Sequence, residues 1–138
     1  MQKRWILILL TMVFFLLGSS TAWAMDIRVL LGNESYSQEV KINRGDYTLY
    51  DGSFGLEKKV LSAGDSLKFS YNGGLIAFSI NNETQMTASG YVKLAANDAD
   101  SLFDYKNHKY RGDFSIYPQN NGLLPINILN LESYLYGV

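Results

Sequence analysis

Short segments in which apolar and polar residues alternate make up most of the chain after residue 24. Such alternation is typical of β-strands that bury one face and expose the other. Glycine, asparagine and aspartate separate the segments, as expected for turns. The predicted strands cover residues 26–31, 39–43, 47–50, 57–61, 66–71, 75–80 and 123–129, with a polar edge strand over 85–93 and one or two strands within 103–118.

The turn residues indicate how these strands connect. Residues 26–51 predict a β-meander with tight turns, and Asn72-Gly73-Gly74 is a strong hairpin signal. Residues 95–100 predict a loop, and Asn130 would cap a short helix that opens with residues 131–135. The pattern therefore predicts a mainly β fold of antiparallel meander strands with the start of a short C-terminal helix.

The first 24 residues differ from the rest. Lys3 and Arg4 precede an apolar run over residues 5–17, and Ala22-Trp23-Ala24 forms a small-x-small cleavage site. The run is shorter than the roughly 20 residues that cross a bilayer. We expect residues 1–24 to be a signal peptide and residues 25–138 to be one exported, extracytoplasmic domain. The alternative is an uncleaved leader, which would be the protein's contact with the membrane.

Composition excludes several functions. The chain has 12 basic and 13 acidic residues, so it lacks the positive charge that nucleic-acid binding needs. It has no cysteine, which excludes disulfides, thiolate metal sites and cysteine nucleophiles. The single histidine, His108, cannot form a zinc site alone, and we expect it to be an exposed strand or turn residue. No cofactor is predicted.

Two groups of side chains could act on a sugar. A carboxylate pair could catalyse glycoside cleavage, but sequence spacing does not show that any two face each other. The aromatic residues could stack on sugar rings, although a buried sheet face explains most of them better. The carboxylates are Asp98, Asp100, Asp104, Asp113 and Glu132, and the aromatic residues are Phe103, Tyr105, Tyr110, Phe114 and Tyr117.

The tripeptide Arg-Gly-Asp occurs at residues 44–46 and 111–113. Some adhesion proteins use this tripeptide. Turn formation explains it more simply, because glycine permits the bend and aspartate bonds to local backbone. Glu132 also has a simple explanation, since a helix dipole favours a negative charge in the first turn.

The last third of the chain resembles the SpoIID/LytB domain, the family of stage II sporulation protein D and the amidase enhancer. The resemblance lies in Tyr110-Arg111-Gly112 and in the segment from Leu124 to Val138, LPINILNLESYLYGV. It is similar to a family pattern of Y-R-G followed by V-N-x-L-x-L-E-x-Y-L-x-G-V. The matching positions are Arg111, Gly112, Asn130, Glu132, Tyr134, Leu135 and Gly137.

The resemblance implies an α+β fold for the complete domain and peptidoglycan glycan strands as the ligand. Family members are lytic transglycosylases of sporulation or proteins that enhance a cell-wall amidase. Arg111, Glu132 and Tyr134 are the positions expected to contact the substrate. The family's catalytic acid follows the Gly-Val pair, and the sequence ends at Val138. We therefore expect an incomplete domain without a catalytic residue. The alternative is a non-catalytic β-module that binds the wall or an amidase.

A purified protein of residues 25–138 is expected not to cleave glycan strands, because it lacks the acid that would protonate the leaving oxygen. The measurement is mass spectrometry of the soluble products after incubation with purified strands. Release of anhydro-muropeptides would contradict the prediction.

Overall fold

The structure is a computed structural model that describes residues 25–52, 56–83 and 85–137. The predicted signal peptide, residues 1–24, lies outside this part of the chain. The described residues form strands and one short helix, in this order: β1 (Asp26–Leu30), β2 (Ser37–Arg44), β3 (Tyr47–Asp51), β4 (Leu56–Leu61), β5 (Ser66–Asn72), β6 (Leu75–Ile80), β7 (Met86–Ala88), β8 (Val92–Ala96), β9 (Leu102–Tyr105), β10 (His108–Arg111), β11 (Asp113–Gln119), β12 (Gly122–Asn130) and α2 (Leu131–Gly137).

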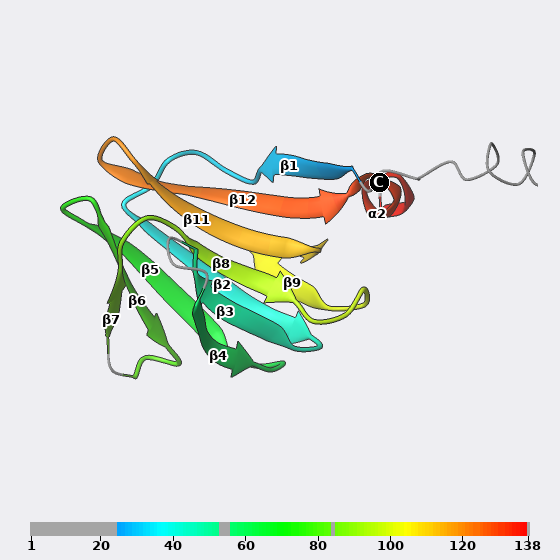
Figure 1. The fold of residues 1–138 in the computed structure, drawn as a ribbon, viewed down its shortest axis with the longest axis horizontal. Coiled ribbons are helices and arrows are strands. Elements are labelled where there is room, and N and C mark those ends of the chain that lie inside the picture. Colours follow the sequence, from blue (N-terminus) through cyan, green and yellow to red (C-terminus); the bar gives the residue numbers. More distant parts are fainter. Residues whose placement is uncertain (1–24, 53–55, 84, 138) are drawn as a thin grey trace, which may run out of the picture.

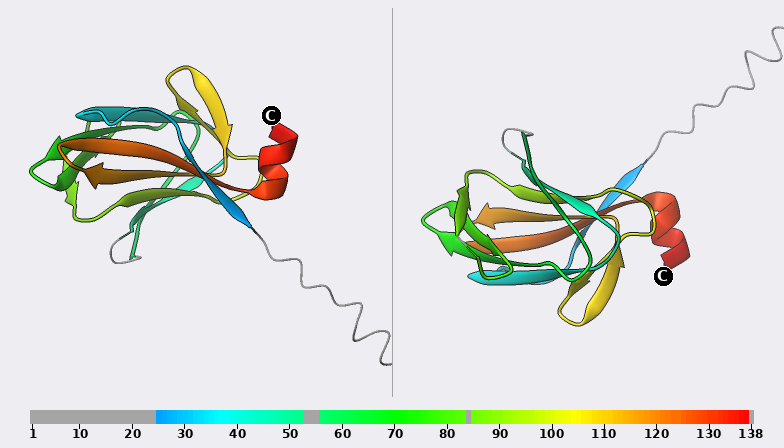
Figure 2. Two further views of the ribbon diagram at one scale, coloured as in Figure 1. Left: turned by 90° about the horizontal axis from the view of Figure 1, so that it is seen from above. Right: turned by 90° about the horizontal axis from the view of Figure 1, so that it is seen from below.

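The strands form two antiparallel sheets of six strands each (Figures 1 and 2). The first sheet has the order β1-β12-β11-β8-β3-β4, and the second has the order β10-β9-β2-β5-β6-β7. Helix α2 follows β12 at one end of this pair of sheets (Figure 1). The predicted mainly β, antiparallel fold with a short C-terminal helix is confirmed.

The sequence between Gln85 and Lys93 does not form the single edge strand predicted for it. It contains β7, at the edge of the second sheet, and the start of β8, inside the first sheet. Gly90 separates them with a φ of 83°, where the chain leaves one sheet for the other. The prediction was wrong because polar residues also occur in a central strand. Val92 is buried, and Lys93 follows it in β8, which pairs with a strand on each side.

Two neighbouring segments also differ from their predictions. The loop predicted for residues 95–100 begins later, since residues 95 and 96 still belong to β8. Residues 103–118 belong to three strands rather than one or two. Lys106 and Asn107, with positive φ angles, form the turn between β9 and β10, and Gly112, also with a positive φ angle, separates β10 from β11.

The meander predicted for residues 26–51 is wrong, because β1, β2 and β3 do not pair with one another. β1 lies beside β12, β2 lies between β5 and β9, and β3 lies between β4 and β8. Consecutive strands pair instead further along the chain: β3 with β4, β5 with β6, β6 with β7, β9 with β10, and β11 with β12. Local turn residues show where the chain bends, but the pairing depends on which apolar faces can share a core.

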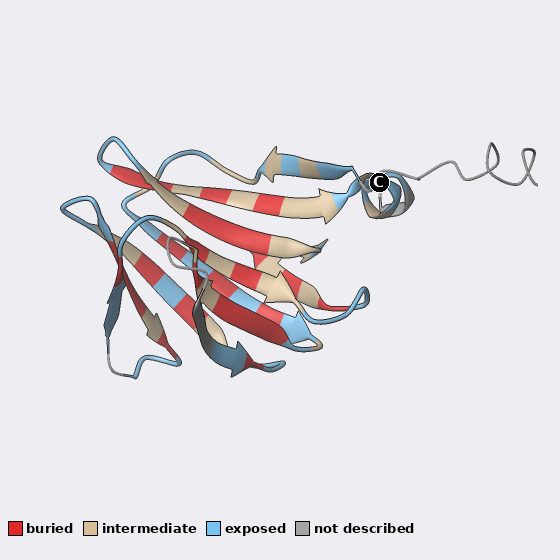
Figure 3. Ribbon diagram, in the orientation of Figure 1, coloured by how far each residue is buried: buried red, intermediate tan, exposed pale blue. Residues whose placement is uncertain are grey.

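Apolar side chains from both sheets form one core, and buried residues recur along the strands of both layers (Figure 3). Phe114 of the first sheet is the centre of an aromatic cluster. Its ring centroid lies 5.3 Å from that of Phe103, 6.0 Å from that of Tyr105 and 6.3 Å from that of Phe69, all in the second sheet. These contacts hold the two layers together through large apolar surfaces.

The preference for core packing over sugar stacking is confirmed for three of the five aromatic candidates. Phe103, Tyr105 and Phe114 are fully buried. Tyr110 stacks on Phe103 at 5.5 Å, and Tyr117 is half-buried on the outer face of the first sheet, stacked on another tyrosine.

Two buried tyrosine hydroxyls have opposite surroundings. Tyr105 Oη donates a hydrogen bond of 2.6 Å to Gln38 Oε1. Tyr47 Oη is buried and has no hydrogen-bond partner among the described residues. Burial raises the pKa of the Tyr47 hydroxyl far above its usual range, and the carboxylates of Asp113 and Asp98 raise it further. Tyr47 therefore carries an uncompensated desolvation cost.

The matched pair Tyr47→Phe and Tyr105→Phe tests this difference. Tyr47→Phe is expected to leave the free energy of unfolding unchanged or raise it by about 1 kcal/mol, because it removes an unpaired polar group. Tyr105→Phe is expected to lower it by about 1 kcal/mol, because it deprives Gln38 of a donor. Urea unfolding measures both variants, and a larger loss for Tyr47→Phe would contradict the assignment.

Candidate functional site

Both Arg-Gly-Asp tripeptides lie at corners where the chain passes from the second sheet to the first. Arg44 ends β2 and Arg111 ends β10, and β3 and β11 begin within three residues of the preceding arginine. Gly45 and Gly112 have φ angles of 75° and 83°. Both arginines are in register with Leu102 of β9, so the two corners lie at the same end of the protein. The tripeptides thus form turns, as predicted.

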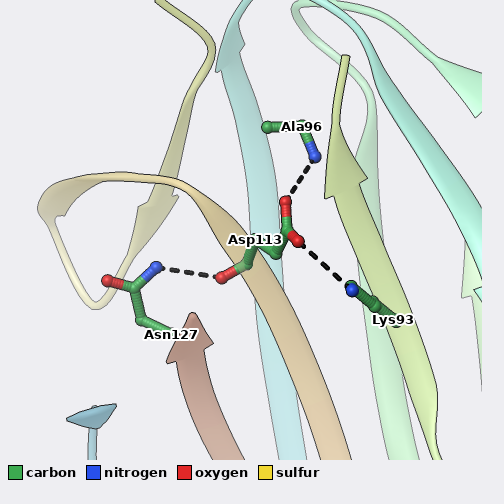
Figure 4. Close-up of polar contacts among 4 residues, drawn as sticks. All are labelled: Lys93, Ala96, Asp113 and Asn127. Carbon is green, nitrogen blue, oxygen red and sulfur yellow. Dashed lines mark hydrogen bonds and ion pairs between the residues drawn. The ribbon is translucent and has the colours of Figure 1, made fainter. Parts of the chain in front are cut away.

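The second corner admits only glycine. A Cβ atom at Gly112 would lie 2.5 Å from the carbonyl oxygen of Ile128 in β12. The side-chain amide of Asn127 fixes the same corner by donating two hydrogen bonds. Its Nδ2 atom donates to the carbonyl oxygens of Arg111, at 2.7 Å, and of Asp113, at 2.9 Å. Figure 4 shows the second of these bonds.

The carboxylate of Asp113 holds the corner to β8 (Figure 4). One oxygen accepts a hydrogen bond of 2.8 Å from the backbone N–H of Ala96, and the other lies 3.3 Å from Lys93 Nζ. The ion pair is partly exposed, so it contributes at most about 1 kcal/mol. Because both oxygens are engaged, Asp113 serves as a structural anchor between β11 and β8.

Asn130 caps helix α2, as predicted. Its Oδ1 atom accepts a hydrogen bond of 2.7 Å from the backbone N–H of Ser133. Glu132 is exposed in the first helical turn, where the helix dipole favours its charge. The cap sets the direction of the helix as it leaves β12 and thereby places Tyr134 beside the corner.

Two hollows adjoin at this corner, and Arg111, Leu129 and Ser133 line both of them. The first, which we call the charged hollow, has a volume of about 360 Å³ and is lined also by Asp26, Lys93, Ala96, Asp98, Ala99, Gly112, Asp113, Ile128 and Asn130. The second, which we call the tyrosine hollow, has a volume of about 350 Å³ and is lined also by Val29, Leu31, Leu102, Lys109, Tyr110, Asn127 and Tyr134.

The structure brings together two of the three residues predicted to contact substrate. Arg111 is exposed and Tyr134 is 39% exposed, and both line the tyrosine hollow. Glu132 is not among the lining residues of either hollow. Leu135 is 65% exposed on α2, and Gly137 is the last helical residue.

The remaining predicted candidates serve the local structure. Asp98 Oδ1 accepts hydrogen bonds from Asp100 N, at 3.0 Å, and from Ser101 Oγ, at 3.3 Å, in the loop after β8. Asp104 accepts a bond of 3.0 Å from Asn43 on the second sheet. Asp98 and Asp113 line one hollow, but their hydrogen bonds fix the loop and the corner.

His108 is exposed at the start of β10, as expected, with its ring edge to face against Tyr110 at 6.5 Å. Within residues 25–52, 56–83 and 85–137, no group of three or more histidine, aspartate or glutamate side chains could hold a metal ion. In the same part of the chain, no helix has the length and apolar character of a membrane span.

Three residues of this site were not predicted from the sequence. Lys93 and Lys109 had no recognisable signal, because strand pairing alone brings them to the corner. Asn127 did have one, since it matches the asparagine of the V-N pair in the family pattern. The structure shows its role, which is to donate hydrogen bonds to the two carbonyl oxygens of the corner.

Comparisons with protein-family models, with curated proteins and with solved structures give no match for this chain. The resemblance to the SpoIID/LytB domain therefore stays a prediction.

Asn127→Asp is expected to lower the free energy of unfolding by about 2–3 kcal/mol. The substitution keeps the side chain's size but removes both N–H donors and sets a carboxylate against two carbonyl oxygens. The exposed Asn121→Asp is the matched control and should change stability by less than about 0.5 kcal/mol. Urea unfolding of the two variants decides, and equal effects would contradict the proposed role of Asn127.

Proposed function

We propose that this chain is an exported peptidoglycan-remodelling protein of the SpoIID/LytB type, and that it binds glycan strands in the tyrosine hollow. One observation carries the proposal. The two segments of the sequence pattern, separated by more than ten residues, meet where Asn127 bonds to the corner at Gly112. This meeting sets Arg111 and Tyr134 on the same hollow.

The lining of the hollow suits a sugar. Tyr110 and Tyr134 offer ring surface for the apolar faces of a pyranose, and the aliphatic side chains extend that surface. Arg111 and Lys109 offer positively charged donors to hydroxyl and carboxylate oxygens. An apolar surface with a few polar groups at its rim is the usual composition of a small-molecule site.

A non-catalytic module that binds a cell-wall amidase is the second candidate. The exposed side chains of α2 favour it, because Leu135 is 65% exposed beside Tyr134 at the end of the protein. Exposed apolar groups of this kind often mark protein contacts. Under this reading, Leu135→Ser weakens binding of the amidase and leaves glycan binding unchanged.

Arg111→Gln and Tyr134→Ala are each expected to weaken binding to glycan strands about tenfold, by removing a charge-assisted hydrogen bond or a stacking surface. The measurement is co-sedimentation of the purified protein with peptidoglycan at increasing concentrations. Arg28→Gln is the matched control, because Arg28 is exposed on β1 and does not line the hollow.

Glu132→Gln distinguishes the two explanations of that residue. Unchanged binding would assign Glu132 to the helix dipole, and a tenfold loss would assign it to substrate, as the resemblance implies. Wild-type protein that fails to sediment with peptidoglycan would contradict the proposed function. Equal losses in Arg28→Gln and Arg111→Gln would contradict the placement of the site.

A further inference from the structure

A larger groove lies on the second sheet, on the outer side of β10, β9, β2 and β5. Its volume is about 770 Å³, more than twice that of the tyrosine hollow. Four strands spaced about 4.8 Å apart give it a width of about 14 Å. We call it the lysine groove, and it is lined by Ser37, Gln38, Glu39, Lys41, Lys68, Phe69, Asp104, Tyr105, Lys106, Asn107 and Lys109.

The lysine groove has the opposite charge to the protein around it. Four lysines line it, against the carboxylates of Glu39 and Asp104. The whole chain has 12 basic and 13 acidic residues, and two of the basic ones, Lys3 and Arg4, belong to the predicted signal peptide. The remaining chain therefore has ten basic and 13 acidic residues. Four of those ten positive charges gather in one groove.

Three of the groove lysines lie opposite a carboxylate across the strands without forming an ion pair with it. Lys41 and Lys109 are both in register with Asp104, and Lys68 is in register with Glu39. Yet within the described residues the ion pair formed is that of Lys93 with Asp113, outside the groove. All four groove lysines are exposed, and the Nζ atom of Lys106 lies 5.4 Å from the centre of the Tyr105 ring.

The polar groups between the lysines indicate which kind of anionic ligand fits the groove. Glu39, Asp104 and Asn107 can accept hydrogen bonds, which suits a ligand that carries hydroxyl groups as well as negative charge. The aromatic residues of the lining, Phe69 and Tyr105, are buried beneath the groove. Stacking of nucleic-acid bases needs exposed rings, which this groove does not offer.

We propose that the lysine groove binds a linear, hydroxyl-bearing phosphodiester polymer, such as a polyol phosphate chain. The lysine ammonium groups pair with successive phosphates across the four strands, and the carboxylates between them accept hydrogen bonds from the hydroxyl groups of the polymer. This is a second site, separate from the proposed glycan function, although Lys109 lines both the groove and the tyrosine hollow.

The test uses poly(glycerol phosphate) as the probe and leaves Lys109 unchanged. Wild-type protein is expected to bind the polymer saturably, with affinity that falls as salt rises. The double variant Lys41→Gln/Lys68→Gln should bind about tenfold more weakly, the effect of losing an ordinary exposed ion pair at each position. The matched control, Arg28→Gln/Lys59→Gln, removes two exposed charges outside the groove and should bind like wild type.

Isothermal titration calorimetry measures the binding of the polymer, and thermal unfolding checks that each variant is folded. Three outcomes would overturn the proposal: no saturable binding by wild type, equal weakening in the two double variants, or binding of single-stranded DNA as tight as that of poly(glycerol phosphate). Peptidoglycan co-sedimentation of Lys41→Gln/Lys68→Gln separates the two proposals. Unchanged sedimentation is expected, because neither lysine lines the tyrosine hollow.

Discussion

The passage of the chain between its two sheets at Gly112 depends on one side-chain amide. Asn127 donates to the carbonyl oxygens on both sides of the glycine, in partly buried surroundings. The positive φ of Gly112 and its close approach to β12 leave no room for another residue. The corner sets the point at which β11 begins beside β12.

The same corner explains why functional candidates gather at one end of the protein. Asp113 ties the corner to β8, and Asn130 directs the helix that follows β12. These structural residues thus hold Arg111 and Tyr134 at the edge of the tyrosine hollow. A rigid sheet end that presents a few mobile polar side chains is a common way to build a binding site.

Sequence patterns predicted the features that depend on neighbouring residues. The strand alternation, the helix cap at Asn130 and the turn role of the two Arg-Gly-Asp tripeptides required only local chemistry. The patterns could not predict which strands pair, because the alternation of polar and apolar residues around Val92 is the same for a central strand as for an edge strand. The lysine groove was equally hidden, since Lys41, Lys68 and Lys109 come from three strands that only the sheet order brings together.

The pairing of β1 with β12 has a consequence for how the protein folds. Asp26 faces Asn130, so the first described strand and the last one close a loop that contains nearly the whole domain. The entropy cost of closing that loop must be met before the pair forms, and such long-range pairing slows folding to the range of milliseconds to seconds. β1 therefore has no sheet to join until β12 has been synthesised, and a chain still emerging from the ribosome cannot complete its first sheet.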